Sequence, residues 1–178
     1  NKKGEATQSV TMQKLRQYPI NFGVTTLGRQ LYVPEIIEPG INFLQNVGYH
    51  GFCEIEFKRH SKTGKYLMVD LNARITSFTS MLDACKMEAA YLVYRDLIDK
   101  PLPSYHLKEN TNKAFYHFFE DFFASYEYLR SGQLTLWQII KPLLKYKKIH
   151  AIWAIDDIKP FFVFYWMKIK RQFQKLMK

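Results

Sequence analysis

Two short stretches in which apolar and polar residues alternate, 50–58 and 66–75, constrain the fold of this chain more than any other feature. The first reads "HGFCEIEFK" and the second "YLMVDLNARI", and between them lies "RHSKTGK", a turn by its composition. A period of two places successive side chains on opposite faces of a strand. Two such runs joined by a short polar turn predict a β-hairpin.

The acidic and amide residues of both predicted strands fall on one face of this hairpin. With the turn centred on Thr63, Glu56 lies directly across from Asp70, and Glu54 lies across from Asn72. A slip of the register by two residues would leave the same side chains on that face. Two carboxylates that face each other are destabilising unless a cation lies between them or one of them is protonated.

Arg74 points to the same side as Asn72, so the face combines carboxylates, an amide oxygen and a guanidinium. Magnesium prefers hard oxygen ligands, typically one or two carboxylates completed by water and phosphate oxygens. An arginine holds phosphates through charge-assisted hydrogen bonds. The residues by themselves leave two interpretations open: a magnesium and nucleotide site, or the solvent face of a half-buried sheet.

The stretch "HGFCEIEFKRHSKTGKYLMVDLNAR" resembles the C-terminal subdomain of the ATP-grasp superfamily, whose members join a carboxylate to an amine or thiol through an acylphosphate. The upstream "LRQYP" and "GVTT" and the later "DDIKP" are also similar to this family, in particular to D-aspartate ligase-like and carbamoyl-phosphate synthetase large chain-like bacterial proteins. The resemblance covers residues 12–103 well and the rest weakly.

This resemblance implies roles for the hairpin residues. Glu56, Asp70 and Asn72 would bind the Mg²⁺ or Mn²⁺ that bridges the phosphates of ATP, and Arg74 would steady the phosphates and the acylphosphate. The chain departs from the family pattern at two positions. Asp70 stands where the family usually has a glutamate, which shortens its reach, and Ala73 replaces the usual proline.

The resemblance also implies what the chain lacks. The adenine pocket and the glycine-rich loop of the family have no counterpart in this sequence. We therefore expect the C-terminal half of an ATP-dependent carboxylate–amine ligase, whose substrates are a small-molecule carboxylate and an amine such as an amino acid. The missing N-terminal ATP-binding half would be its partner, and the chain alone would bind ATP poorly and be inactive.

Other basic and hydroxyl residues are candidates for the same site. Arg16 and Lys14 match positions where the family carries basic groups near the acyl acceptor or phosphate, and we place Arg16 with Arg74 among the catalytic candidates; a surface charge is the alternative for both. Arg29 is a weaker candidate of the same kind. Thr76 and Ser77 follow Arg74 and could bind phosphate or substrate, or cap the next helix.

The fold class expected is α+β, with an antiparallel sheet and packed helices over 1–103 and a mostly helical extension over 104–178. Hydrophobic residues make up 47% of the 178, which is typical of a globular protein. The pattern predicts further elements, listed here in chain order: helix 34–48, interrupted or kinked at Pro39; helix 77–100, as one helix or two that meet near Cys85; strand 114–119; helices 120–131 and 134–146; strand 149–155; and a last helix from Pro160.

The formal net charge is +10, and residues 141–178 hold ten Lys or Arg against Asp156 and Asp157, which leaves +8 there. A basic end indicates either an anionic neighbour or a solvated face. The last helix, "KPFFVFYWMKIKRQFQKLMK", could contact an anionic membrane peripherally, or dock its aromatic half on the protein. The alternative function is therefore a non-catalytic basic module that binds a membrane surface or nucleic acid; the ligase interpretation expects no nucleic acid. For the aromatic run 118–132 we expect packing.

The two cysteines, Cys53 and Cys85, argue against a disulfide framework and fit a reducing compartment. The five histidines show no zinc-ligand spacing. With no signal-peptide pattern, we expect a cytoplasmic protein.

Overall fold

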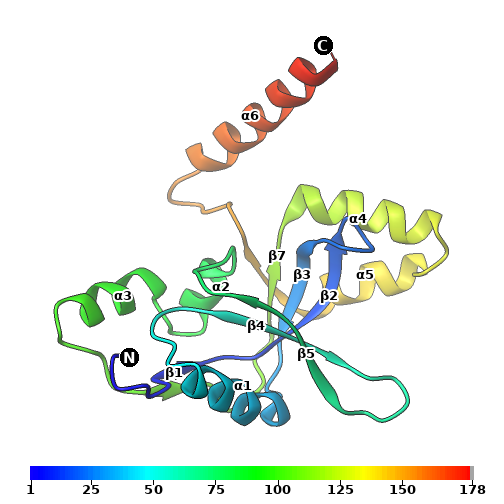
Figure 1. Cartoon of the computed structure of the whole chain (residues 1–178). Helices are drawn as coiled ribbons and strands as arrows, with labels where there is room; N and C mark the ends of the chain where they lie inside the picture. The colour runs from blue at the N-terminus through cyan, green and yellow to red at the C-terminus, as the bar shows by residue number, and fades with distance from the viewer. Residues whose placement is uncertain (177–178) are drawn as a thin grey trace.

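The computed structural model describes residues 1–176 and has a mixed α/β fold with helices and small sheets (Figure 1). Its largest sheet has the order β2-β3-β7-β8. The strands are β2 (Met12–Tyr18), β3 (Val24–Gln30), β7 (Lys113–Tyr116) and β8 (Lys147–His150). The first three are antiparallel, as expected, but β8 runs parallel to β7. The sheet is therefore mixed, not purely antiparallel.

The largest sheet takes strands from both sides of residue 103, where we expected a boundary between two parts. Strands β7 and β8 come from the second part and extend the β2–β3 pair of the first. A short parallel pair joins β1 (Gln8–Ser9) to β6 (Tyr105–His106) across the same boundary. Residues 104–150 thus complete the sheet of the N-terminal part, because the aromatic run that begins at Ala114 supplies a central strand.

The predicted hairpin is present as β4 (Glu54–Arg59) and β5 (Tyr66–Asn72), a two-stranded sheet of its own. Helix α1 (Pro34–Asn46) continues through Pro39 without interruption. It packs on the apolar face of the hairpin at Gly40, where an added Cβ would lie 3.4 Å from Ile55 and 3.7 Å from Phe57. The absence of a side chain at Gly40 allows this close approach of the helix to the hairpin.

The region 77–100 forms two helices, α2 (Thr79–Ala84) and α3 (Ala89–Leu97), separated at Cys85 as one of the two expectations had it. Lys86 between them has a φ of 64°. Helix α2 covers β7, where Phe78 meets Phe115 edge-on with ring centroids 4.7 Å apart. The hydrophobic core is centred here, on Met81, Cys85, Met87, Leu107 and Phe115.

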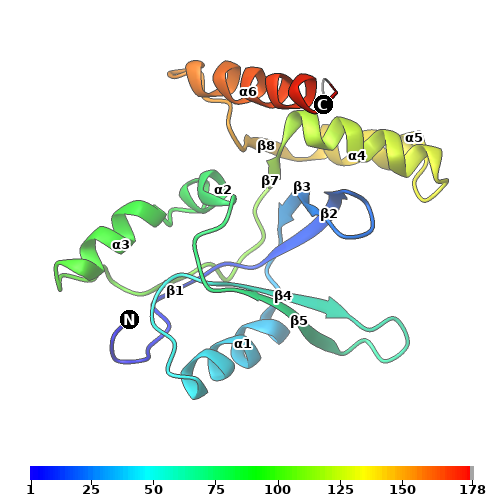
Figure 2. The ribbon, with the colours of Figure 1, turned by 45° about the horizontal axis from the view of Figure 1, so that its top comes forward.

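Three helices lie toward the C-terminal end: α4 (Phe118–Arg130), α5 (Leu136–Lys145) and α6 (Lys159–Leu176). Helices α4 and α5 lie side by side (Figure 2), and α6 contacts the start of α4 through Phe119 and Glu120. At the start of α5 Thr135 and Gln138 form a capping box, in which each side chain bonds the backbone of the other residue.

None of the helices formed by residues 1–176 combines the length and apolar character needed to cross a bilayer.

Candidate functional site

The hairpin places the predicted polar residues together on one face. Glu56 pairs with Asp70 and Glu54 pairs with Asn72, so the register predicted from a turn at Thr63 is confirmed. Toward the turn the register shifts by one residue, because Phe57 pairs with Met68 and Val69 is left without a partner. Such a bulge twists a strand locally and re-aims its side chains. Here it lies directly beside Asp70.

Hydrogen bonds connect the side chains of β5 and the segment after it. Asn72 donates from Nδ2 to Asp70 Oδ2 at 3.0 Å and accepts at Oδ1 from Arg74 Nη2 at 3.0 Å. Arg74 is exposed and also donates to the carbonyl of Ile75. The amide of Asn72 thus fixes both the acid and the guanidinium, which gives the exposed side chains a defined arrangement.

Strand β2 contributes a cation to the same face. Lys14 Nζ lies 3.1 Å from Glu56 Oε2, and both side chains are about one-third exposed. This ion pair meets the condition for facing carboxylates, since a positive charge lies next to Glu56. Of the basic residues suggested for the site outside the hairpin, Lys14 is the one that the fold brings to it.

Glu54 is the more buried acid of this face. Thr76 donates its hydroxyl to Glu54 Oε2 at 2.6 Å. Burial raises the pKa of Glu54 and the charge of Glu56 raises it further, while Thr76, Lys14 and Arg74 oppose the rise. Thr76 therefore binds an acid and does not cap α2, whose first residues receive no side-chain cap. Ser77 lies exposed beside it.

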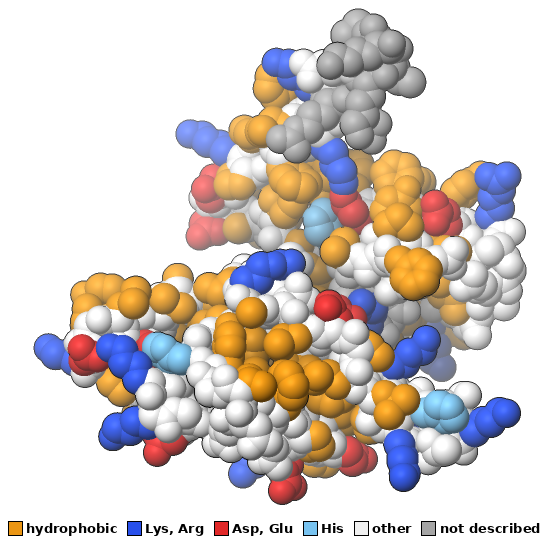
Figure 3. Space-filling view, in the orientation of Figure 1, with side chains coloured by type: hydrophobic (Ala, Val, Ile, Leu, Met, Phe, Trp, Pro, Cys, Tyr) orange, Lys and Arg blue, Asp and Glu red, His pale blue; other side chains and the backbone are white. Residues whose placement is uncertain are grey.

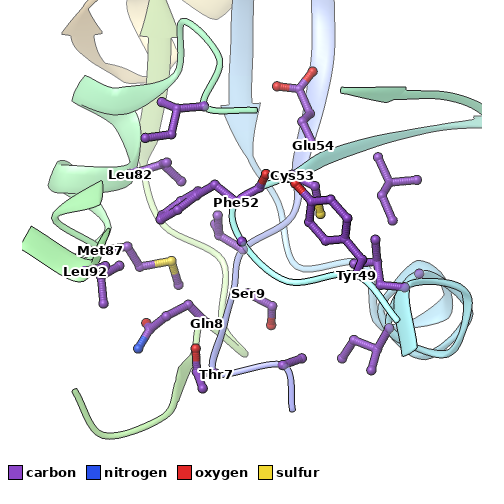
Figure 4. Close-up of a pocket in the computed structure, with 18 of the residues that line it drawn as sticks. Thr7, Gln8, Ser9, Tyr49, Phe52, Cys53, Glu54, Leu82, Met87 and Leu92 are labelled. Carbon is purple, nitrogen blue, oxygen red and sulfur yellow. Dashed lines mark hydrogen bonds between the residues drawn. The ribbon is translucent and has the colours of Figure 1, made fainter. Parts of the chain in front are cut away.

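The charged face borders a cavity of about 630 Å³ (Figure 4). Leu82, Met87 and Leu92 lie on one side of it, and Tyr49 and Cys53 lie on the other. Most of the wall is apolar and comes from the N-terminal segment 1–14, from α1 and α3, and from the stretch 49–57 that leads into β4, while Lys14, Glu54, Glu56, Arg74 and Thr76 contribute its charged and polar end. Hydrophobic side chains gather around β4, between α1 and α2, on the surface seen in Figure 3. A volume in this range suits a small-molecule ligand.

The oxygen atoms of the face suit a hard divalent cation. Glu56 and Asp70 offer carboxylates from directly opposed positions, and Asn72 offers a carbonyl oxygen. Among residues 1–176 no group of three or more His, Cys, Asp or Glu is arranged to hold a metal, so Asn72 would have to serve as a ligand. Because its Oδ1 now accepts from Arg74, binding a cation would exchange that hydrogen bond for a metal bond.

Arg16, by contrast, lies away from this face. It is 2% exposed and forms a two-pronged ion pair with Asp121, with Nε–Oδ1 2.8 Å and Nη2–Oδ2 2.6 Å. Its remaining nitrogen donates to the carbonyl of Ile139, and Thr26 donates to Asp121. These contacts join β2 to α4 and α5. The expected proximity of Arg16 to Arg74 and the hairpin acids is not observed.

Arg29 is likewise occupied elsewhere, with hydrogen bonds to Gln13 and to the hydroxyl of Tyr146. Sequence reasoning missed Asp121, which governs the position of Arg16. The signal was available in "FFEDFF", because an acid inside an aromatic run needs a partner when the run is packed. The separation of 105 residues hid which arginine that partner is.

Comparisons of the chain with protein-family models, with curated proteins and with solved structures find no match.

Proposed function

We propose that this chain is the C-terminal half of an ATP-dependent carboxylate–amine ligase of the ATP-grasp type. The observation that carries the proposal is the direct pairing of Glu56 with Asp70 on the hairpin, with Asn72 and Arg74 hydrogen-bonded beside them. Opposed acids joined to an exposed guanidinium are a costly arrangement for a solvent face and a useful one for a cation bound to phosphates. The family resemblance of the same residues supports this interpretation.

In this proposal each hairpin residue has a separate task. Glu56, Asp70 and Asn72 hold Mg²⁺ or Mn²⁺, which when bound draws charge away from the ATP phosphates. Arg74, which is exposed and would be released from Asn72 when the cation binds, binds a phosphate oxygen. Lys14 forms an ion pair with Glu56 and holds its carboxylate at the face. Arg16 joins β2 to α4 through its ion pair with Asp121. Because its guanidinium is buried in this pair, it does not contact a reactant.

The reaction class follows from these tasks. A substrate carboxylate takes the γ-phosphoryl group of ATP to form an acylphosphate, and an amine then displaces the phosphate to give an amide, ADP and phosphate. Catalysis of this kind depends on positioning and charge neutralisation. The cavity beside the face gives a substrate room next to Lys14 and Arg74. The adenine pocket and the phosphate-covering loop would come from the N-terminal half.

The test uses the protein as its native cell makes it, captured with an antibody to this chain. ADP release is measured with ATP, Mg²⁺ and a panel of amino acids. Asp70→Asn should lower amino-acid-dependent turnover by about a hundredfold, because losing a metal-site group costs 10–100-fold or more. Asp83→Asn, which changes an exposed aspartate of α2, is the matched control and should leave turnover unchanged. Equal turnover in wild type and Asp70→Asn would remove the proposed site.

A further inference from the structure

Helix α4 is amphipathic, but its acidic side is buried and its apolar side is exposed. Its buried residues are Glu120, Asp121 and Ala124, and Asp121 is held there by Arg16. Its exposed residues are large and apolar, and they recur at positions that share one side of a helix: Phe118, Phe122, Tyr126 and Leu129. Phe122 alone is 65% exposed. Asp121 holds the buried side of the helix against β2, so the aromatic side faces outward, where Phe118 contacts Tyr116 at a centroid distance of 6.1 Å and Phe122 is largely exposed.

Helix α6 extends this aromatic surface. Phe161 and Tyr165 pack on Phe119 of α4, with ring centroids 6.2 and 4.2 Å apart, and Lys168 forms an ion pair with Glu120. The expectation that the aromatic half of this helix docks on the protein is therefore met for one side. On its other sides, Phe162, Val163, Trp166 and Met167 are exposed, Trp166 by 62%.

The two apolar faces are continuous. Neighbouring rings meet in the order Phe118, Phe119, Phe161 and Phe162, with centroid distances of 5.1, 6.2 and 5.5 Å. We call the following exposed apolar residues of the two helices the α4–α6 surface: Phe118, Phe122, Tyr126, Leu129, Phe162, Val163, Trp166 and Met167. Figure 3 shows hydrophobic side chains at the surface over α4. Contiguous apolar surface of this kind marks an interaction site.

The charge around the α4–α6 surface is positive. Glu120 and Asp121 are buried in ion pairs, so the half-buried Glu127 is the remaining acid of α4. Two lysines of α6 lie beside its aromatic rings: Lys170 Nζ is 5.1 Å from the centre of the Trp166 ring, and Lys168 Nζ is 5.9 Å from that of Phe164. Residues 141–178 carry a formal charge of +8, from ten basic residues minus Asp156 and Asp157. The complementary partner is therefore anionic and also accepts aromatic and aliphatic side chains.

We propose that the α4–α6 surface binds the interface of an anionic lipid bilayer, with its aromatic side chains among the acyl chains and its lysines at the headgroups. Tryptophan and tyrosine favour this interface, and basic residues near the surface add attraction to anionic lipids. Nucleic acid would satisfy the charge but would leave aliphatic residues such as Val163 and Leu129 exposed. This inference goes beyond the proposed ligase function, and its failure would leave that function intact.

The test is co-sedimentation of the whole chain with vesicles of phosphatidylcholine, with and without phosphatidylserine. Binding should require phosphatidylserine and weaken as salt is raised. The double variant Phe162→Ser, Trp166→Ser should bind about tenfold more weakly or worse, because two buried side chains are lost from the interface. The double variant Tyr94→Ser, Leu97→Ser removes similarly exposed residues from α3 and should bind like wild type.

A second measurement reports on insertion itself. The fluorescence of Trp166 should shift to the blue when anionic vesicles are added, and Trp166→Phe should lose this shift while it keeps most of the binding. Equal binding to neutral vesicles would overturn the proposal. So would an unchanged affinity of the Phe162→Ser, Trp166→Ser variant, or tighter binding to single-stranded RNA than to the anionic vesicles.

Discussion

Two arginines of the first half of the chain, Arg16 and Arg74, differ in their exposure to solvent. Arg16 is buried, and its guanidinium is bound to Asp121 and to the carbonyl of Ile139. Arg74 is exposed, and it is held by the amide of Asn72, which also contacts Asp70. We call Arg16 and Asp121 the buried set, and the hairpin acids with Asn72 and Arg74 the hairpin set. Both sets contain an arginine and an aspartate, but the groups of the buried set bind each other away from solvent, whereas the arginine of the hairpin set is exposed.

The difference lies in which groups remain free. A buried ion pair loses the solvation of both charges and is stable only when every donor and acceptor has a partner. Arg16 and Asp121 meet that requirement and join β2 to α4. The hairpin set leaves an exposed guanidinium and two acids in water, where a ligand can exchange with the existing hydrogen bonds. We infer that the first set serves the fold and the second serves binding.

The largest effect should come from the buried set. Arg16→Met leaves the Asp121 carboxylate buried without its partner and should lower the free energy of unfolding by about 3–5 kcal/mol. Urea denaturation followed by circular dichroism measures this. Adding Asp121→Asn removes the orphan charge while it keeps an acceptor for Thr26, so the double variant should recover part of the loss. A loss below about 1 kcal/mol, typical of a surface pair, would contradict the comparison.

A smaller, pH-dependent effect is expected at His117, beside the buried set. Burial lowers the pKa of His117 below its usual value of 6.5, and the nearby Lys168 lowers it further. At mildly acidic pH the unfolded chain binds a proton at His117 that the folded chain does not. The contribution of His117 to the free energy of unfolding is therefore complete above pH 6.5 and is lost as the pH drops through the pKa of the folded state.

Denaturation at several values of pH between neutral and mildly acidic checks this. His117→Gln should flatten the profile. Part of the slope should remain, because burial also lowers the pKa of His150, and adding His150→Gln should flatten it again. If His117→Gln and wild type lose stability in parallel on acidification, the assignment to His117 is wrong.

At the hairpin, Glu54 should give stability a pH dependence of the opposite sign. Burial raises the pKa of Glu54, so the folded chain holds its proton more tightly than the unfolded chain and loses stability as the pH rises through the folded pKa. Glu54→Gln keeps an oxygen that can accept from Thr76 and should be modestly more stable than wild type at pH 7. The gain should vanish near pH 4, where the glutamate is protonated. A destabilisation of equal size at both values of pH would count against burial as the cause.

The sequence predicted the hairpin in detail and the rest of the fold in outline. Alternation and a polar turn are local, so they determine the pairing of Glu56 with Asp70. The bulge at Val69 was not predictable, because no single residue there demands it. The pairing of β7 with β3 and the burial of Arg16 depend on contacts between residues about ninety to a hundred positions apart, which periodicity cannot reveal. The aromatic run of α4 was expected to pack, and it is largely exposed because Asp121 determines which side turns inward.

The most direct test of the central claim is whether the hairpin face binds a divalent metal. Mn²⁺ is added to the ¹⁵N-labelled chain, with and without ATP, and paramagnetic broadening of the backbone amide signals is mapped. The strongest broadening is expected at Glu56, Asp70 and Asn72. Asp70→Asn should abolish the broadening, with a change in stability of no more than about 0.5 kcal/mol, and Asp83→Asn should preserve it. Broadening centred elsewhere, or unchanged in Asp70→Asn, would contradict a metal and phosphate site on this face.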